Sequence, residues 1–132
     1  MKGAREHRVP LSTAAIAALD RMKALHGQFI FPGSGPGRGL WQTALLRQLD
    51  RMGRDDVTAH GFRSTFRDWA AERTNFPREV VETALAHSVG NAVEAAYRRG
   101  DLFDKRRRLM DAWTEFCAKP ATTGTVVNLR KA

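Results

Sequence analysis

The sequence has little cysteine and no long apolar run. Cys117 is the only cysteine among 132 residues, so an internal disulfide is excluded and a reducing compartment is favoured. The first ten residues lack the apolar segment of a signal peptide, and no run approaches the ~20 apolar residues that span a bilayer. We therefore expect a cytoplasmic protein without a membrane partner. Cys117 follows apolar residues at helical spacing, and we predict a core position for it.

The motifs of common metal and nucleotide sites are also missing. The sequence has no His-Glu-x-x-His motif and no paired cysteines, and its four histidines do not have the spacing of metal ligands. The segment PGSGPGRG at 32–39 lacks the Gly-Lys-Ser/Thr ending of a phosphate-binding loop, so we interpret it as an ordinary loop. The sequence therefore predicts neither a metal nor a nucleotide cofactor.

Acidic residues are scarce relative to basic ones. Lys and Arg number 22 against 14 Asp and Glu, which gives a formal net charge of +8. A basic excess of this size favours polyanionic partners, because neutralising phosphates releases condensed counterions. Ribosomal proteins and proteins that bind anionic membranes share this signature, so charge alone does not identify DNA as the partner.

Apolar residues at helical spacing predict a mainly α fold with at most a small β-hairpin near the N-terminus. Pro10 excludes a helix in the first segment, and Ser12 suits the N-cap of a helix that stops by Gly27. Residues 28–31 suit a brief strand. Further helices are expected over 40–51, from His60, from Pro77, from about Asn91 to Gly100, and over 104–118.

The apolar residues of three of these helices define the predicted core. The helix from His60 contributes Phe62, Phe66, Trp69 and Ala70, the helix from Pro77 contributes Val81, Ala84 and Leu85, and the last helix contributes Leu109, Met110, Trp113, Phe116 and Cys117. From Pro120 onward the sequence has no helical period. We therefore predict one domain over 1–118 and a flexible tail over 119–132.

Four polar features of the sequence contain side chains of the types that take part in catalysis. His60 and Arg63 lie three residues apart at a predicted helix start, so both side chains can share one face. His87 follows a predicted helix end in LAHSVG, and Tyr97, the only tyrosine, comes ten residues later. Lys2 lies beside the first extended segment. Taken singly, each feature has an ordinary explanation. A histidine near a helix end is usually a cap or solvated, and a single tyrosine is usually half-buried. An arginine on a helix usually belongs to an exposed basic face, and Lys2 would ordinarily lie in a frayed terminus.

The order and spacing of these residues resemble those of the tyrosine recombinases, above all the integrases of prophages and genomic islands. His-x-x-Arg is followed 24 residues after Arg63 by Leu-Ala-His, and ten residues further on by Tyr97. The flanking segments HGFRSTFRDWAAE, PREVVETALAHSVG, AAYRR and RRRLMDAWTEF resemble segments of that family in the same order. The resemblance extends from Lys2 to about Ala118, and it implies the C-terminal part of the integrase catalytic domain.

The resemblance implies a role for each matched residue. Tyr97 would attack a DNA phosphodiester and form a 3′-phosphotyrosyl link, and Arg63 would hold the non-bridging oxygens. His60 would assist as a base or proton-holding partner, His87 would donate a hydrogen bond to the phosphate, and Lys2 would protonate the leaving 5′ oxygen. No metal or other cofactor is then required, because Arg and Lys supply the positive charge. Backbone contacts to DNA are expected from the basic stretch 98–108 and from Arg67, Arg78, Arg98 and Arg99.

The family's catalytic domain also carries an arginine upstream of the matched lysine, and a core-binding domain precedes it. Neither has a counterpart here, so the resemblance predicts a fragment or truncated product that is inactive alone, with double-stranded DNA and other recombinase subunits as its partners. Two alternatives stay open: a DNA-binding module without chemistry, and a basic helical interaction protein such as a ribosomal accessory factor. The second gives no reason for the ordered His, Arg and Tyr set. Type IB topoisomerases share the tyrosine chemistry, but LAHSVG and AAYRR are integrase-like.

Overall fold

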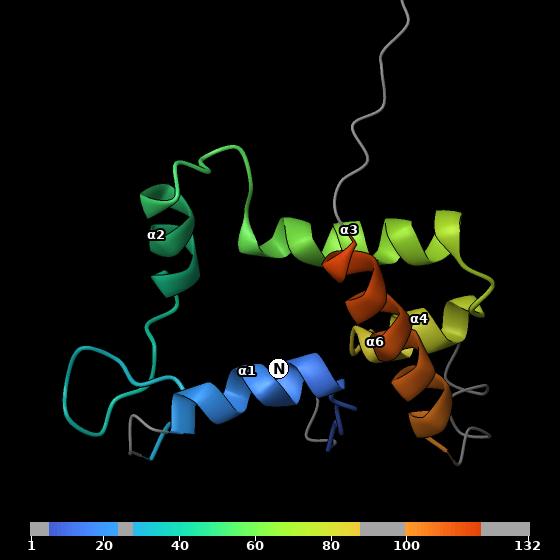
Figure 1. Ribbon diagram of the computed structural model, residues 1–132, viewed down its shortest axis with the longest axis horizontal. Coiled ribbons are helices and arrows are strands. Elements are labelled where there is room, and N and C mark those ends of the chain that lie inside the picture. Colours follow the sequence, from blue (N-terminus) through green and yellow to red (C-terminus); the bar gives the residue numbers. More distant parts are fainter. Residues whose placement is uncertain (1–5, 24–27, 88–99, 120–132) are drawn as a thin grey trace, which may run out of the picture.

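The computed structural model describes residues 6–23, 28–87 and 100–119, and helices dominate these ranges (Figure 1). The helices are α1 (Thr13–Lys23), α2 (Ala44–Arg51), α3 (Ala59–Arg73), α4 (Arg78–Ala84) and α6 (Phe103–Ala118). Within the same ranges there is no strand, and residues 28–31, for which a strand was predicted, form bends. An isolated antiparallel bridge joins Pro32 to Gly39. The predicted mainly α class is confirmed.

Local capping explains where the helices begin. The Ser12 hydroxyl accepts a hydrogen bond from the backbone N–H of Ala15 at 3.3 Å, as the predicted N-cap requires. The Thr58 hydroxyl likewise accepts from the N–H of Gly61 at 3.0 Å and starts α3. The helix predicted from Pro77 begins at Arg78, with Pro77 as its N-cap residue at a φ of −57°. The helix predicted over 40–51 starts only at Ala44, because a turn precedes it.

The core lies where α4 packs against both α3 and α6 (Figure 1). Trp113 of α6 meets Phe66 edge-on at 5.3 Å between ring centroids, and it lies 4.9 Å from Trp69. Burial of each large apolar side chain stabilises the folded chain by roughly 1.5–3 kcal/mol. The buried apolar side chains of this core therefore hold α3, α4 and α6 in fixed relation. Its buried members are Phe66, Trp69, Ala70, Val80, Val81, Leu85 and Leu109.

Three predicted core positions, Phe62, Phe116 and Cys117, are wrong. Phe62 is 56% exposed, because the buried part of α3 starts only at Phe66 and Phe62 lies one turn before it. Cys117 is also exposed, and it lies in the last turn of α6 beyond Phe116, whose ring contacts Trp69 of α3 at 5.5 Å between centroids. Phe116 is 40% exposed but still stacks on Trp113.

The first segment of the chain is joined to the start of α6 by a group that we call the Arg106 cluster, formed by Arg8, Asp101 and Arg106. The Arg106 side chain is 1% exposed. Its Nη1 donates to the backbone oxygen of Arg8 at 2.6 Å, its Nε to the backbone oxygen of Asp101 at 2.8 Å, and its Nη2 to Asp101 Oδ2 at 3.0 Å. Arg8 pairs with the same carboxylate at 2.8 Å. Residues 98 positions apart are therefore held together.

α2 and the loop before it contribute little to this core. α2 buries none of its residues, and in Figure 1 it stands apart from α3, α4 and α6. Trp41 is 76% exposed, and Leu45 and Leu46 also face solvent. The part of the chain that the structure describes contains no helix long and apolar enough to cross a membrane.

Candidate functional site

Arg63 on α3 and His87 after α4 meet although 24 residues separate them in the sequence. The Nη2 atom of Arg63 lies 3.2 Å from Nε2 of His87 and also donates a hydrogen bond to the backbone oxygen of Leu85. That carbonyl belongs to the end of α4, where no helical N–H is available to it. The contact therefore joins the first half of α3 to the C-terminal end of α4.

The end of α4 determines where His87 lies. Ala86 adopts the left-handed conformation, with a φ of 55°, and its N–H donates to the oxygen of Thr83 at 3.0 Å. The N–H of His87 donates to the oxygen of Glu82 at 2.9 Å. This pair of bonds is the Schellman motif, which reverses the chain direction after a helix. The reversal brings His87 back over the last turn of α4.

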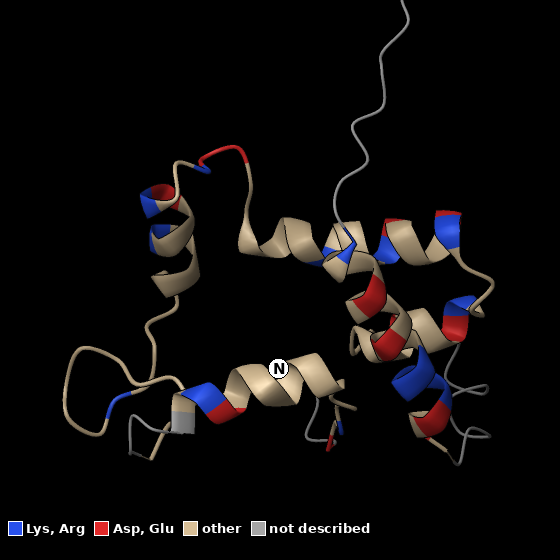
Figure 2. Cartoon of the chain, in the orientation of Figure 1, with Lys and Arg blue, Asp and Glu red and all other residues tan. Residues whose placement is uncertain are grey.

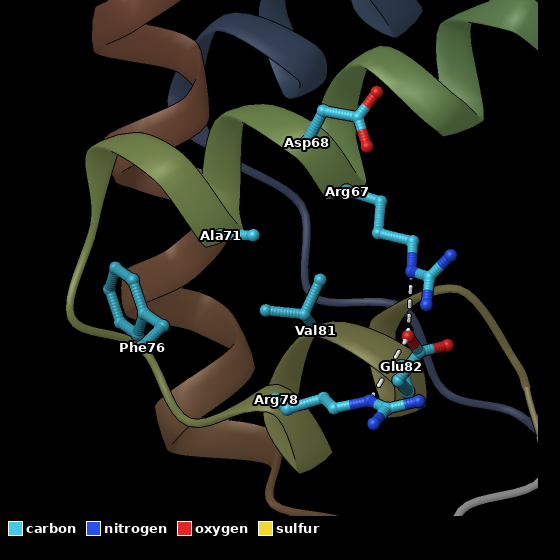
Figure 3. Close-up of a pocket in the computed structure, with 7 residues that line it drawn as sticks. All are labelled: Arg67, Asp68, Ala71, Phe76, Arg78, Val81 and Glu82. Carbon is cyan, nitrogen blue, oxygen red and sulfur yellow. Dashed lines mark hydrogen bonds and ion pairs between the residues drawn. The ribbon is translucent and has the colours of Figure 1, made fainter.

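Glu82 links His87 to α3. Its Oε2 lies 2.6 Å from Nδ1 of His87, and its Oε1 accepts from Nε of Arg67 at 2.8 Å. Arg78 is more distant, with its Nε 3.9 Å from the same Oε1 (Figure 3). The Glu82 side chain is only 10% exposed. The hydrogen bond with His87 and the charge of Arg67 lower the pKa of Glu82, although burial opposes this shift.

These contacts define the hydrogen-bonding state of His87. An ionised carboxylate only accepts, so Nδ1 of His87 carries the proton toward Glu82. A guanidinium only donates, so Nε2 accepts from Arg63. An anion that reached this point could receive hydrogen bonds from Arg63 and, once Nε2 is protonated, from His87. The arrangement is therefore chemically suited to a phosphate oxygen.

The other predicted site residues have different positions. His60 is exposed on α3, in the turn before Arg63, and none of the hydrogen bonds between described residues joins it to Arg63 or His87. Arg67 pairs with Glu82 and keeps about half of its side chain exposed. The predictions for Lys2, Tyr97, Arg98 and Arg99, and the helix predicted from Asn91 to Gly100, lie outside the described residues, as does most of the predicted tail.

The basic residues at the start of α6 differ in their exposure to solvent. Figure 2 shows Lys and Arg along the first half of α6, where Lys105, Arg107 and Arg108 are exposed. Arg106 is buried in the cluster described above, so the prediction that the whole stretch 98–108 contacts DNA is wrong for this residue. The helical period explains the difference, since Arg106 lies on the same side of α6 as Leu109.

Sequence reasoning missed Glu82. It precedes His87 by five residues, a spacing that brings two side chains together only if the chain reverses between them. The reversal depends on Ala86, an alanine in a conformation that usually favours glycine. The sequence offered one usable signal, the single acidic residue in the segment VVETALAH.

An open groove of about 470 Å³ lies beside Glu82, between α3 and α4. Its apolar lining is formed by Ala71, Phe76 and Val81, and its charged lining by Arg67, Asp68, Arg78 and Glu82 (Figure 3). Both arginines already pair with Glu82, so the groove adds no separate anion site. Among the residues that the structure describes, no group of three or more His, Cys, Asp or Glu is arranged to hold a metal ion.

The chain is similar to integrases of phages and prophages. It is 39% identical over 131 residues to the prophage integrase IntA of Escherichia coli strain K12, a match that covers 96% of this chain and 31% of that protein. It is 32% identical over 123 residues to the integrase of Enterobacteria phage P4, and 29% identical over 121 residues to the integrase of Shigella phage Sf6. The chain is therefore similar to a part of these phage and prophage integrases.

The similarity to these integrases covers nearly the whole chain but only part of each relative. Each match covers 88% or more of this chain but only 28% to 31% of the length of the relative. No protein-family model matches the chain, and no solved structure matches it. The similarity to integrases therefore rests on these relatives.

Proposed function

We propose that this chain acts in site-specific recombination of double-stranded DNA, with Arg63 and His87 binding the phosphate that Tyr97 attacks. The observation that carries the proposal is the 3.2 Å contact between Arg63 Nη2 and His87 Nε2. Two groups that suit a phosphate meet there from separate elements, and both were selected from sequence spacing. The relatives' name, integrase, supports DNA recombination as the reaction of the whole protein.

The reaction follows from the chemistry of these groups. The Tyr97 oxygen attacks the phosphorus in line, its proton passes to His60, and the bond from phosphorus to the 5′ oxygen breaks. Lys2 gives a proton to that oxygen, which leaves as a hydroxyl. Negative charge gathers on the non-bridging oxygens in the transition state, and Arg63 and His87 stabilise it. Rejoining reverses the steps, with a 5′-hydroxyl attacking the phosphotyrosyl link.

Formation of a covalent adduct with DNA tests this proposal. The chain is fused behind the remainder of a related integrase and mixed with a nicked suicide substrate that carries the relative's site. We expect a protein–DNA adduct that survives SDS, and we expect Tyr97→Phe to abolish it with DNA affinity unchanged within about threefold, because only the nucleophilic oxygen is removed. An undiminished adduct in Tyr97→Phe would exclude Tyr97 as the nucleophile.

A second candidate function is a DNA-binding module without chemistry. The observation in its favour is that Arg63 already donates to Leu85 and His87 already pairs with Glu82, so both groups have partners without DNA. This candidate predicts salt-dependent binding by the fusion but no adduct. We expect residues 1–132 alone to bind DNA but not to exchange strands, since the second arginine that the family resemblance implies has no counterpart in them. Loss of one such donor typically costs about 10²–10³ in rate.

A further inference from the structure

We propose that Glu82 is the positioning residue of the site, which holds His87 with its Nε2 atom directed at Arg63 and at the phosphate. The inference rests on the proposed function, because it gives Glu82 a task in the phosphate contact made by His87. It adds a residue that neither the spacing of the motifs nor the resemblance to recombinases assigned.

Two bonds from one residue hold the His87 ring. The backbone oxygen of Glu82 accepts from the His87 N–H at 2.9 Å, and its Oε2 accepts from Nδ1 at 2.6 Å. The carboxylate is itself held by Arg67, whose Nε lies 2.8 Å from Oε1. The His87 ring cannot rotate away from Arg63 without breaking the bond to a largely buried carboxylate, which would leave that group without its closest partner.

The same contacts select one tautomer. With the proton on Nε2 alone, His87 would present a donor to Arg63, which has only donors, and a lone pair to Glu82, which has only acceptors. With the proton on Nδ1, both contacts are satisfied. When a phosphate takes the Arg63 donor, a second proton on Nε2 allows His87 to donate to a phosphate oxygen, and the Glu82 charge balances the imidazolium.

The charged groups around His87 come from two helices. Arg63 and Arg67 lie on α3, and Glu82 and Arg78 lie on α4. Glu82 is the acidic member of this set, and it contacts His87 directly. The competing explanation is that Glu82 only ties α4 to α3 through Arg67. That explanation predicts a loss of stability when Glu82 is replaced, but no specific change in the His87 ring.

The ring state can be measured on residues 1–132 without DNA. Imidazole ¹⁵N spectra at about pH 8, where an ordinary histidine is neutral, report which nitrogen carries the proton. The His87 signal is assigned by its absence from a His87→Asn variant. We expect the Nδ1–H form in the unchanged chain and in Glu82→Gln, whose amide oxygen still accepts. We expect the ring to lose this preference in Glu82→Ala.

The matched control is Glu115→Gln, which removes one carboxylate from an exposed pair with Lys119 on α6. It should leave the His87 signal unchanged. A thermal melt accompanies each variant, and Glu82→Leu, which fills the site without a hydrogen-bond acceptor, replaces Glu82→Ala with the same expected result if Glu82→Ala does not fold. Persistence of the Nδ1–H form in folded Glu82→Ala would overturn the positioning role, as would its loss in Glu115→Gln.

The second readout separates cleavage from binding in the fusion with the related integrase. We expect Glu82→Ala to slow single-turnover adduct formation at least about tenfold, with DNA affinity within about threefold, and we expect Glu82→Gln to recover most of the rate. Equal losses of affinity and rate in both variants would overturn the proposal. If the ring changes as expected but the unchanged fusion forms no adduct, the proposed function fails and the positioning of His87 by Glu82 stands.

Discussion

At the scale of single residues, the ionised Glu82 makes the stability of the chain sensitive to acid. The hydrogen bond from His87, followed by the charge of Arg67, lowers the pKa of Glu82 against the effect of burial. Because the folded pKa lies below the unfolded value of about 4.3, the carboxylate stabilises the fold above that pH. This contribution is lost as the pH falls through the folded pKa.

Glu82→Gln tests this sensitivity, because glutamine does not titrate. We expect its unfolding free energy to be lower than that of the unchanged chain at neutral pH and to fall less steeply in acid, so that the two curves converge. Urea denaturation between pH 3 and pH 7 gives both curves. Parallel curves over this range would show that Glu82 is not the titrating group.

Replacing Ala86 by glycine is expected to raise the stability of the chain, whereas Glu82→Gln is expected to lower it. The φ of 55° at Ala86 costs an L-residue roughly 1–2 kcal/mol that glycine does not pay, and glycine is the residue that most often follows a helix in this conformation. We expect Ala86→Gly to stabilise the chain by about 0.5–1 kcal/mol in urea denaturation. The control is Ala71→Gly in α3, which should destabilise by a similar amount because its backbone is helical. Destabilisation by Ala86→Gly would show that the turn is not strained.

The candidate site was only partly predictable from single residues. The spacing of His60 and Arg63 required no knowledge of packing, because both belong to one helix. The meeting of Arg63 with His87 required the α3–α4 contact, and the role of Glu82 required the reversal at Ala86. Neither the α3–α4 contact nor the reversal at Ala86 follows from residue type alone, and for this reason the sequence did not point to Glu82. The roles of Tyr97 and Lys2 stay predictions.

At the scale of elements, Arg106 joins the segment before α1 to the start of α6. Truncation to alanine would leave two backbone oxygens and the Asp101 carboxylate without their shared donor. We expect Arg106→Ala to lower the unfolding free energy by about 2–3 kcal/mol. Arg107 is the matched control, since it is exposed on the same helix and its guanidinium lies 5.4 Å from the centroid of the Phe103 ring.

Arg107→Ala should cost less than about 1 kcal/mol. Amide hydrogen exchange adds a local readout, because Arg106→Ala should also speed exchange at Ile16, whose N–H bonds the oxygen of Ser12 just after the released segment. Equal losses of stability in the two variants would contradict the special role of Arg106.

The elements themselves were predictable to different degrees. The starts of α1 and α4 followed from Ser12 and Pro77, because capping depends on a few neighbouring residues. The exposure of Phe62 and Cys117 did not follow, because a helical period gives the apolar face of a helix but not how far along it a neighbouring helix extends. The later start of α2 came from a turn that the apolar pattern of 40–51 conceals.

At the scale of the whole molecule, the net charge of +8 predicts weak DNA binding with little sequence preference. The exposed Arg107 and Arg108 of α6 are expected to be among the contacts (Figure 2). Fluorescence anisotropy with a duplex should show log K falling with log salt by about 0.9 for each phosphate neutralised. Replacing both arginines by alanine should reduce the slope by up to about 1.8.

The matched control for charge is Arg54→Ala with Asp56→Ala, which removes an exposed ion pair whose atoms lie 2.7 Å apart and leaves the net charge unchanged. Its salt slope should equal that of the unchanged chain. Binding that does not respond to salt would show that phosphate contacts are not the source of affinity.

The isolation of α2 has a consequence for how the molecule comes apart. α2 buries none of its residues, whereas α3, α4 and α6 share one core. Opening α2 therefore exposes no part of that core, and its opening need not follow global unfolding. A calorimeter would record the melting of the shared core and register little heat from α2. The number obtained as the stability of the chain would describe α3, α4 and α6, and it would say almost nothing about residues 44–51.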